Sequence, residues 1–157
     1  MDVLLIVLLT LLNAVFAMSE MALASSRKAV LMTLADENAF GAQAALALQE
    51  RPTEFLSTIQ IGITTLGVLN GIMGEAAFSE GLAEALVVWG ISSGVAEWLA
   101  TALVVTIITL NTILFGELVP KRIGQLYPES VARFTAPFML ALATMAKPVV
   151  FFLSGST

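Results

Sequence analysis

Long apolar stretches without any charged side chain alternate with short polar segments along this chain. Three of the stretches are Val3–Ser19, Phe55–Gly74 and Trp98–Gly116, with 17, 20 and 19 residues respectively. A helix of about 20 apolar residues is long enough to cross the hydrocarbon core of a bilayer. The pattern therefore predicts an all-α membrane protein with three transmembrane helices. We expect these helices to span about residues 3–24, 55–75 and 98–119.

The segments beside the spans are predicted to be helices that lie along the membrane. In residues 27–52, apolar positions recur near helical spacing, and Pro52 is suited to open the next helix. The apolar run Phe134–Ala146 has only 13 residues and contains Pro137, so it falls short of the length needed to span, and a fourth span that tolerates Lys147 is the alternative. We predict cytoplasmic, amphipathic juxtamembrane helices over about 27–52 and 129–152. These elements form one domain over residues 1–153, and the small polar residues 154–157 suggest a linker or an artificial chain end.

The distribution of charge predicts how the helices are oriented. Two basic groups are separated by the second and third spans: Arg27, Lys28 and Arg51, then Lys121, Arg122 and Arg133. The stretch Glu75–Glu97 between those spans has four acids and no base, and its apolar residues suggest a small helical hairpin or cap on the membrane surface. Basic residues favour the cytoplasmic side. We therefore expect a multi-pass protein of the inner cell membrane, with the N-terminus outside and the C-terminus in the cytoplasm.

Composition excludes several classes of protein. The chain is 58% hydrophobic and 12% charged, and it has neither Cys nor His, which excludes thiolate and imidazole metal sites. A net charge of −5 argues against nucleic acid as a partner. No nucleophile has an evident base, so an enzyme is not expected. The first apolar run has no basic residue before it, which favours a retained helix over a cleaved signal peptide.

The end of the third span carries the main candidate site. Glu117 follows the uncharged run directly, and a carboxylate in a membrane helix marks a site for an ion, a proton or a partner. Pro120 has no N–H, so the Gly116 carbonyl four residues earlier is expected to lose its helical donor. A free carbonyl beside a carboxylate suits a hard cation. The alternative is an ion pair between Glu117 and Lys121, although we expect Pro120 to break the helical register that such a pair needs.

The first two spans supply further polar groups. Asn13 and Glu20 are seven residues apart and share a helical face, which is typical of a polar seam toward the bundle interior. The alternative, favoured for Glu20 alone, is that this residue marks the cytoplasmic end of its helix. Ser19 lies on a neighbouring face, and Asn70 of the second span offers an amide oxygen. The oxygens of Ser19, Asn70, the Gly116 carbonyl and Glu117 are the candidate ligands of Mg²⁺. Because Ser19 and Asn70 lie toward opposite ends of their spans, they can meet only if the helices are tilted, offset or locally unwound.

The second span also contains Gly67 and Gly71, in the spacing Gly-x-x-x-Gly. Small residues at this spacing let another membrane helix approach closely. We therefore expect helix packing at these two glycines.

Three motifs, in order along the chain, carry a family resemblance. The segments Ser19-Glu20-x-Ala22, Ile59–Thr64 and Phe115–Lys121 resemble the transmembrane domain of the CorC/CNNM family. The resemblance implies a homodimer of three-span subunits, followed by cytoplasmic CBS domains that this chain does not contain. It also implies transport of Mg²⁺, exported in exchange for Na⁺. Many relatives have an Asn pair where this chain has Ile63-Thr64.

The resemblance implies the same Mg²⁺ ligands as the residues themselves suggest. They are Ser19, Asn70, the backbone of Gly116 and the side chain of Glu117. We expect the domain to move Mg²⁺ across the membrane, as efflux coupled to Na⁺. Two alternatives stay open: a Mg²⁺-sensing membrane anchor and dimerisation module that conducts nothing, and a proton- or Na⁺-coupled carrier of another substrate.

Overall fold

The computed structural model describes residues 2–154 of the 157-residue chain, with side chains through Pro148. All elements of this part are helical, so the predicted all-α class is confirmed. In chain order they are α1 (Asp2–Ser25), α2 (Lys28–Asp36), α3 (Ala42–Gln49), α4 (Pro52–Val88), α5 (Ser93–Ile113), the π-helix η1 (Leu114–Leu118), α6 (Val119–Leu126) and α7 (Pro128–Ser154). Of the predicted linker 154–157, Ser154 ends α7 and the other three residues lie outside the described part.

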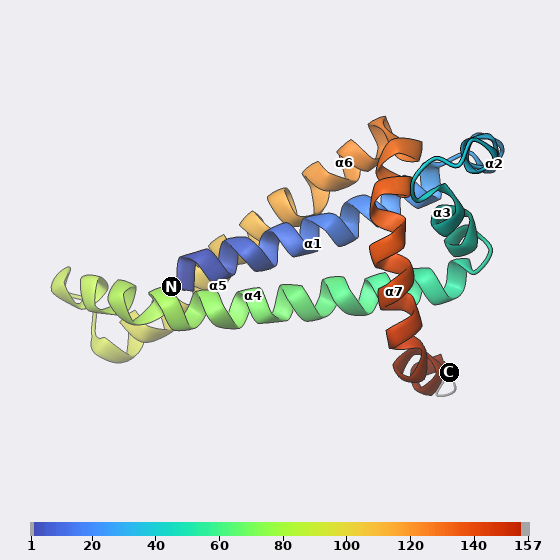
Figure 1. Cartoon of the computed structure of the whole chain (residues 1–157). Helices are drawn as coiled ribbons and strands as arrows, with labels where there is room; N and C mark the ends of the chain where they lie inside the picture. The colour runs from blue at the N-terminus through green and yellow to red at the C-terminus, as the bar shows by residue number, and fades with distance from the viewer. Residues whose placement is uncertain (1, 155–157) are drawn as a thin grey trace.

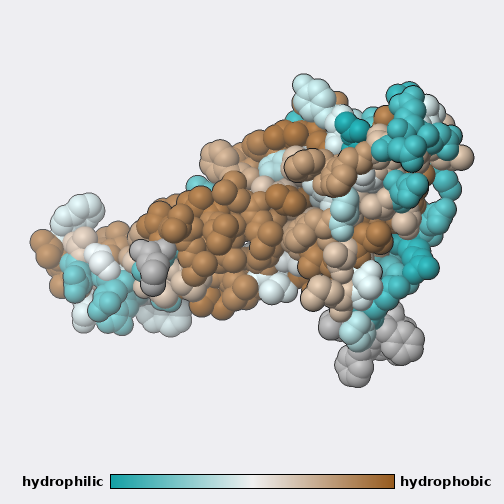
Figure 2. All heavy atoms as spheres, in the orientation of Figure 1, coloured by the Kyte–Doolittle hydropathy of each residue, from teal (hydrophilic) through white to brown (hydrophobic). Residues whose placement is uncertain are grey.

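Three helical segments are long and apolar enough to cross a bilayer, as predicted. They are α1, α4 and the continuous segment α5–η1–α6, with 24, 37 and 34 residues. The three run beside one another, with α1 antiparallel to α4 and parallel to the third segment (Figure 1). Figure 2 shows apolar residues over the middle of these helices and polar residues gathered toward the two ends. This distribution is the one that a bilayer requires.

The hairpin between the second and third segments is longer than the sequence predicts. The second span was expected to end near residue 75, but α4 continues without a break to Val88. Residues 75–88 are rich in Ala, Leu and Glu, which favour helix and let it continue beyond the uncharged run. The chain then turns at Gly90, whose φ of 93° is accessible to glycine. The predicted helical hairpin is present, but its arms are continuations of α4 and α5.

Close packing between the spans uses different glycines from those predicted. A methyl group at Gly62 would overlap the Phe16 ring, and one at Gly74 would lie 2.6 Å from Cγ1 of Ile108. A methyl group at Gly67 or Gly71 would meet nothing within 4 Å. The expectation of helix packing at Gly67 and Gly71 is therefore wrong within this chain. The relative positions of α1 and α5 along α4 place their close contacts at Gly62 and Gly74 instead.

Helices α2, α3 and α7 gather at one end of the long helices (Figure 1). The helix or helix pair predicted over 27–52 is a pair, α2 and α3, and the chain reverses between them, where Gly41 has a φ of 74° and abuts the Arg133 carbonyl. The predicted helix over 129–152 is α7, which crosses α1 and α4 at a steep angle in Figure 1. Phe138 of α7 meets Phe16 of α1 edge to face, with ring centroids 6.5 Å apart.

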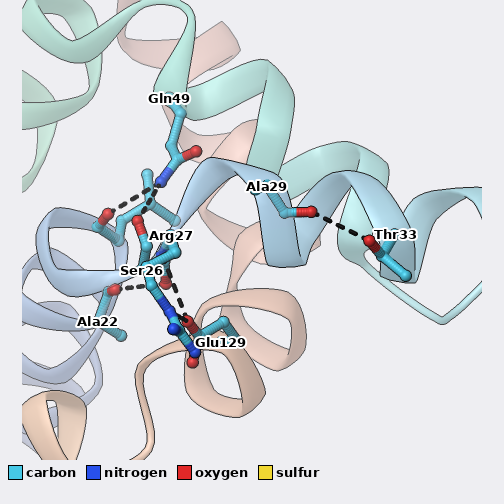
Figure 3. A network of polar contacts seen from close by, with 8 residues as sticks. Ala22, Ser26, Arg27, Ala29, Thr33, Gln49 and Glu129 are labelled. Carbon is cyan, nitrogen blue, oxygen red and sulfur yellow. Dashed lines mark hydrogen bonds and ion pairs between the residues drawn. The ribbon is translucent and has the colours of Figure 1, made fainter.

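The C-terminal end of α1 is tied to both α3 and α7 (Figure 3). The Gln49 side-chain amide donates to the carbonyls of Leu23 at 3.2 Å and Ser26 at 3.1 Å, which are among the carbonyls that the end of a helix leaves unpaired. The Arg27 guanidinium lies 3.4 Å from the Glu129 carboxylate of α7. These contacts fix the position of α1 relative to the helices at its end.

Candidate cation site

One face of α1 carries polar side chains that meet the third segment and α4. We call this set the polar seam. Its members are Thr10, Asn13 and Glu20 of α1, Asn70 of α4, and Thr112, Gly116, Glu117 and Lys121 of the third segment. Since Thr10, Asn13 and Glu20 are spaced by three and seven residues, they project from one side of the helix. This arrangement confirms the predicted shared face of Asn13 and Glu20 and shows that it faces the third segment.

At the first level of the seam, Asn70 joins three helices. Its side chain is 1% exposed, and its Nδ2 donates to Thr10 Oγ1 at 2.8 Å and to Thr112 Oγ1 at 2.7 Å. Thr10 donates its own hydroxyl hydrogen to the Ile6 carbonyl at 2.9 Å, so it can accept from Asn70. The Oδ1 atom of Asn70 is buried and has no hydrogen-bond partner among the described residues. A buried amide oxygen in this state costs about 1–3 kcal/mol unless a cation or donor meets it.

The second level is the break in the third segment. Residues Leu114–Leu118 form a π-helical turn, a feature that is frequent at functional sites. The Gly116 carbonyl accepts a hydrogen bond from Asn13 Nδ2 at 3.1 Å. The glycine is needed for this approach, since a Cβ there would lie 3.0 Å from the Asn13 nitrogen. Asn13 Oδ1, like that of Asn70, is buried and lacks a partner among the described residues.

The expectation of a free Gly116 carbonyl is therefore corrected. Pro120 does remove one backbone donor, but a side-chain amide from another helix supplies a replacement. The Asn13 side-chain nitrogen thus replaces the backbone donor that Pro120 lacks. The Asn13 side-chain oxygen has no partner among the described residues.

The third level is charged. Lys121 Nζ lies 2.8 Å from Glu117 Oε1 and 3.3 Å from Glu20 Oε2. The contact with Glu20 is an ion pair only, and Oε2 has no hydrogen-bond partner among the described residues. The prediction that Pro120 breaks the register between Glu117 and Lys121 is wrong. Pro120 lies in the first turn of α6, directly after the π turn, where the chain remains helical.

Ser19 lies apart from this set. Its side chain is 0% exposed and its Oγ has no partner among the described residues. Six residues separate it from Asn13, so at 3.6 residues per turn it points about 120° away from the seam. The nine residues from Thr10 to Ser19 extend over about 13 Å of helix axis at 1.5 Å per residue. Because Asn70 bonds to Thr10, the structure does not bring Ser19 and Asn70 together.

The seam can offer a cation neutral oxygens along its length and carboxylates at one end. The described residues contain no group of three or more His, Cys, Asp or Glu side chains placed to hold a metal. A cation here would meet mainly amide and hydroxyl oxygens and the carboxylate pair. The seam also contains Thr10 and Thr112, which were not predicted from the sequence. The available signal was spacing, because Thr10 is three residues before Asn13 and Thr112 is four before Gly116.

Comparison with known proteins identifies a family and several relatives of this chain. Residues 4–157 match the family described as Cyclin M transmembrane N-terminal domain. The chain is similar to UPF0053 protein sll0260 of Synechocystis, with 41% identity over 97% of this chain and 34% of that protein. It is also similar to Polyamine export protein of Escherichia coli K12, with 40% identity over 98% and 34%. Polyamine export protein of Haemophilus influenzae is 36% identical over 96% of this chain and 34% of its own length. The chain thus spans about a third of the length of these relatives.

Proposed function

The chain belongs to the cyclin M transmembrane N-terminal domain family, and from this premise we propose that it is the membrane domain of a cation exporter. The multi-pass helical architecture follows from the family and from the three apolar segments. Export of a cation is our proposal, and the polar seam is the path that we propose for it. Ionisable groups inside membrane helices generally mark such paths.

The observation that carries the proposal is the row of buried oxygens that lack hydrogen bonds among the described residues. Asn70 Oδ1 and Asn13 Oδ1 have no partner there, and Glu20 Oε2, which follows them along the seam, has only its ion pair with Lys121 at 3.3 Å. Each would be costly to bury without a ligand. All of them attract positive charge, and the break at η1 contains both the neutral Gly116 carbonyl and the charged Glu117. A helix interrupted next to a cation site is a recurrent device of transporters.

The first candidate for the cargo is a linear polyamine. The carboxylates of Glu117 and Glu20 hold the ammonium group of Lys121 in the structure, so their geometry suits an alkylammonium ion. The oxygens are spread over several turns of α1, as an elongated cation with ammonium groups at intervals requires. Relatives that are 36–40% identical to this chain are named Polyamine export protein.

Mg²⁺ is the second candidate, and it is the cargo that we expect from the sequence. The hard oxygens of Asn70, Ser19, the Gly116 carbonyl and Glu117 favour it. A shell made of all four would require α1 and α4 to shift relative to each other, because Ser19 and Asn70 lie at different levels. The Gly116 carbonyl would also have to exchange the Asn13 amide for the ion.

The wider assembly follows the same proposal. We propose a homodimer in the inner membrane with the N-terminus outside and the C-terminus in the cytoplasm, where CBS domains of a longer chain would follow. Na⁺ is the proposed counter-ion. The basic residues around α2, α3 and the end of α6 support this orientation.

Flux into liposomes tests the proposal and separates the candidates. The purified chain in liposomes should move putrescine or spermidine faster than empty liposomes do, with Mg²⁺ competing if both use one site. Transport of Mg²⁺ without polyamine transport would make the second candidate the function. A membrane anchor that only senses the cation would bind it and give no flux of either, which would contradict the proposal.

A further inference from the structure

The contact between Lys121 and the two carboxylates has a consequence for how the site is used. We propose that Lys121 is a tethered competitor of the transported cation. Its ammonium group pairs with both Glu20 and Glu117 while no cargo is bound, and the cargo must displace it to reach Glu117. This inference rests on the proposed function, because it concerns the same carboxylates.

Distances and charge support displacement. Since both carboxylates contact one nitrogen, at 2.8 and 3.3 Å, the two acidic oxygens lie within about 6 Å of each other. Two negative charges this close, in part-buried side chains, repel strongly unless a cation lies between them. The Lys121 ammonium occupies the position where a cargo cation would lie.

The backbone around Lys121 is fixed, so the competition involves only its side chain. A Cβ at Gly124, three residues later, would lie 2.5 Å from the Met18 carbonyl oxygen and 3.0 Å from the Ala22 nitrogen. Helix α6 therefore packs against α1 with almost no space between their backbones. Lysine suits the role of competitor, because its compact charge is carried on a flexible four-carbon stem. The stem can withdraw the ammonium while α6 stays in place.

A purely structural ion pair would behave differently from a competitor. Removing the charge of a structural partner leaves the carboxylates unpaired and weakens the fold without improving cation binding. Removing a competitor frees the site. If Lys121 holds the carboxylates nine-tenths of the time, its removal improves the apparent affinity for the cation about tenfold.

Kinetics of substituted chains in liposomes make the distinction. Lys121→Met keeps the length of the stem and removes the charge, so the KM for the cation should fall about tenfold. Lys121→Arg keeps the charge beside the carboxylates, so its KM should not fall below that of wild type. Arg122→Met is the matched control, since its exposed neighbouring side chain contacts Gln125 and no carboxylate of the seam. A KM for Lys121→Met that is unchanged or raised would overturn the inference.

A second measurement does not need flux or any variant. The chain has three lysines, and Lys28 and Lys147 are both exposed, so they serve as internal references. With lysine labelled at the ε-carbon, the Lys121 NMR signal in nanodiscs should move toward the other two as Mg²⁺ or putrescine is added. No movement of the Lys121 signal under saturating cation, or an equal shift of all three signals, would contradict displacement. Absence of flux in wild type, with the Lys121 signal still displaced, would instead reject the proposed transport.

Discussion

The two faces of α1 are built on different principles. Toward α4 and α7 the helix presents Phe16, whose ring packs against Gly62 and edge to face against Phe138. Toward the third segment and Asn70 of α4 it presents Thr10, Asn13 and Glu20, and here the amide oxygens of Asn13 and Asn70 are buried without partners among the described residues. The Phe16 face therefore contributes mainly to the fold, and the polar face carries oxygens that a cation could bind. The difference teaches where in this small domain substitutions should unfold the chain and where they should only abolish function.

The largest effect on stability is expected on the apolar face. Gly62→Leu places a side chain where the Phe16 ring lies, so the fold should lose about 3 kcal/mol through overpacking. The thermal unfolding midpoint in detergent measures this loss. Gly67→Leu is the matched control on the same helix, since a Cβ there meets nothing within 4 Å. An equal fall of the unfolding midpoint in the two variants would contradict a special packing role for the Phe16 face.

A smaller loss of stability with a larger loss of function is expected on the polar face. Asn70→Leu removes two interhelical hydrogen bonds but also removes an oxygen without a partner, so the net loss should be about 1 kcal/mol. Cation flux should fall about tenfold or more, because the first level of the seam is gone. Asn111→Leu changes an exposed amide one position from Thr112 and should leave both unfolding and flux unchanged. Full flux in Asn70→Leu would remove Asn70 from the path.

The smallest effect on stability is expected at the C-terminal end of α1, where Arg27 pairs with Glu129 of α7. Burial acts to raise the pKa of the Glu129 carboxyl, but hydrogen bonds from the backbone N–H groups of Glu129 and Arg27, with the Arg27 guanidinium, hold this pKa below its ordinary value of 4.5. A lowered folded-state pKa stabilises the fold above the ordinary value, and this contribution is lost as the pH falls through the folded-state pKa. Arg27 is largely exposed, so the pair is worth at most about 1 kcal/mol.

Unfolding of Glu129→Gln at several pH values measures this contribution. Its midpoint should lie slightly below wild type at pH 7, and the two should converge as the solution becomes more acidic than about pH 4.5. Glu37→Gln, an exposed position after α2, is the control and should follow wild type throughout. A difference between Glu129→Gln and wild type that persists in acid would show that the carboxyl charge is not its cause.

The three spans and part of the polar seam could be predicted from the sequence for two physical reasons. Uncharged runs of spanning length can be counted directly, and the seven-residue spacing of Asn13 and Glu20 defines a face whatever packs against it. The outcome at Pro120 could not be derived in the same way. Whether a proline breaks a helix depends on the turn before it and on outside donors, and here η1 and Asn13 both intervene.

The remaining errors share one cause, which is the register between helices. Gly67 and Gly71 have the spacing for close packing, yet the crossing of α1 and α5 over α4 uses Gly62 and Gly74. The same register places Asn70 level with Thr10, and so separates it from Ser19 by about 13 Å along the axis. Relative depth of this kind is set by packing across helices, and residue spacing within one helix does not contain it.

Flux through Glu117→Gln liposomes tests the central claim most directly, namely that the seam conducts the cation. The variant keeps the shape of the side chain and removes its charge, and Glu97→Gln at the far hairpin controls for loss of an acid elsewhere in the chain. The account predicts that folded Glu117→Gln transports no faster than empty liposomes, whereas Glu97→Gln keeps wild-type flux. Wild-type flux in folded Glu117→Gln would contradict it.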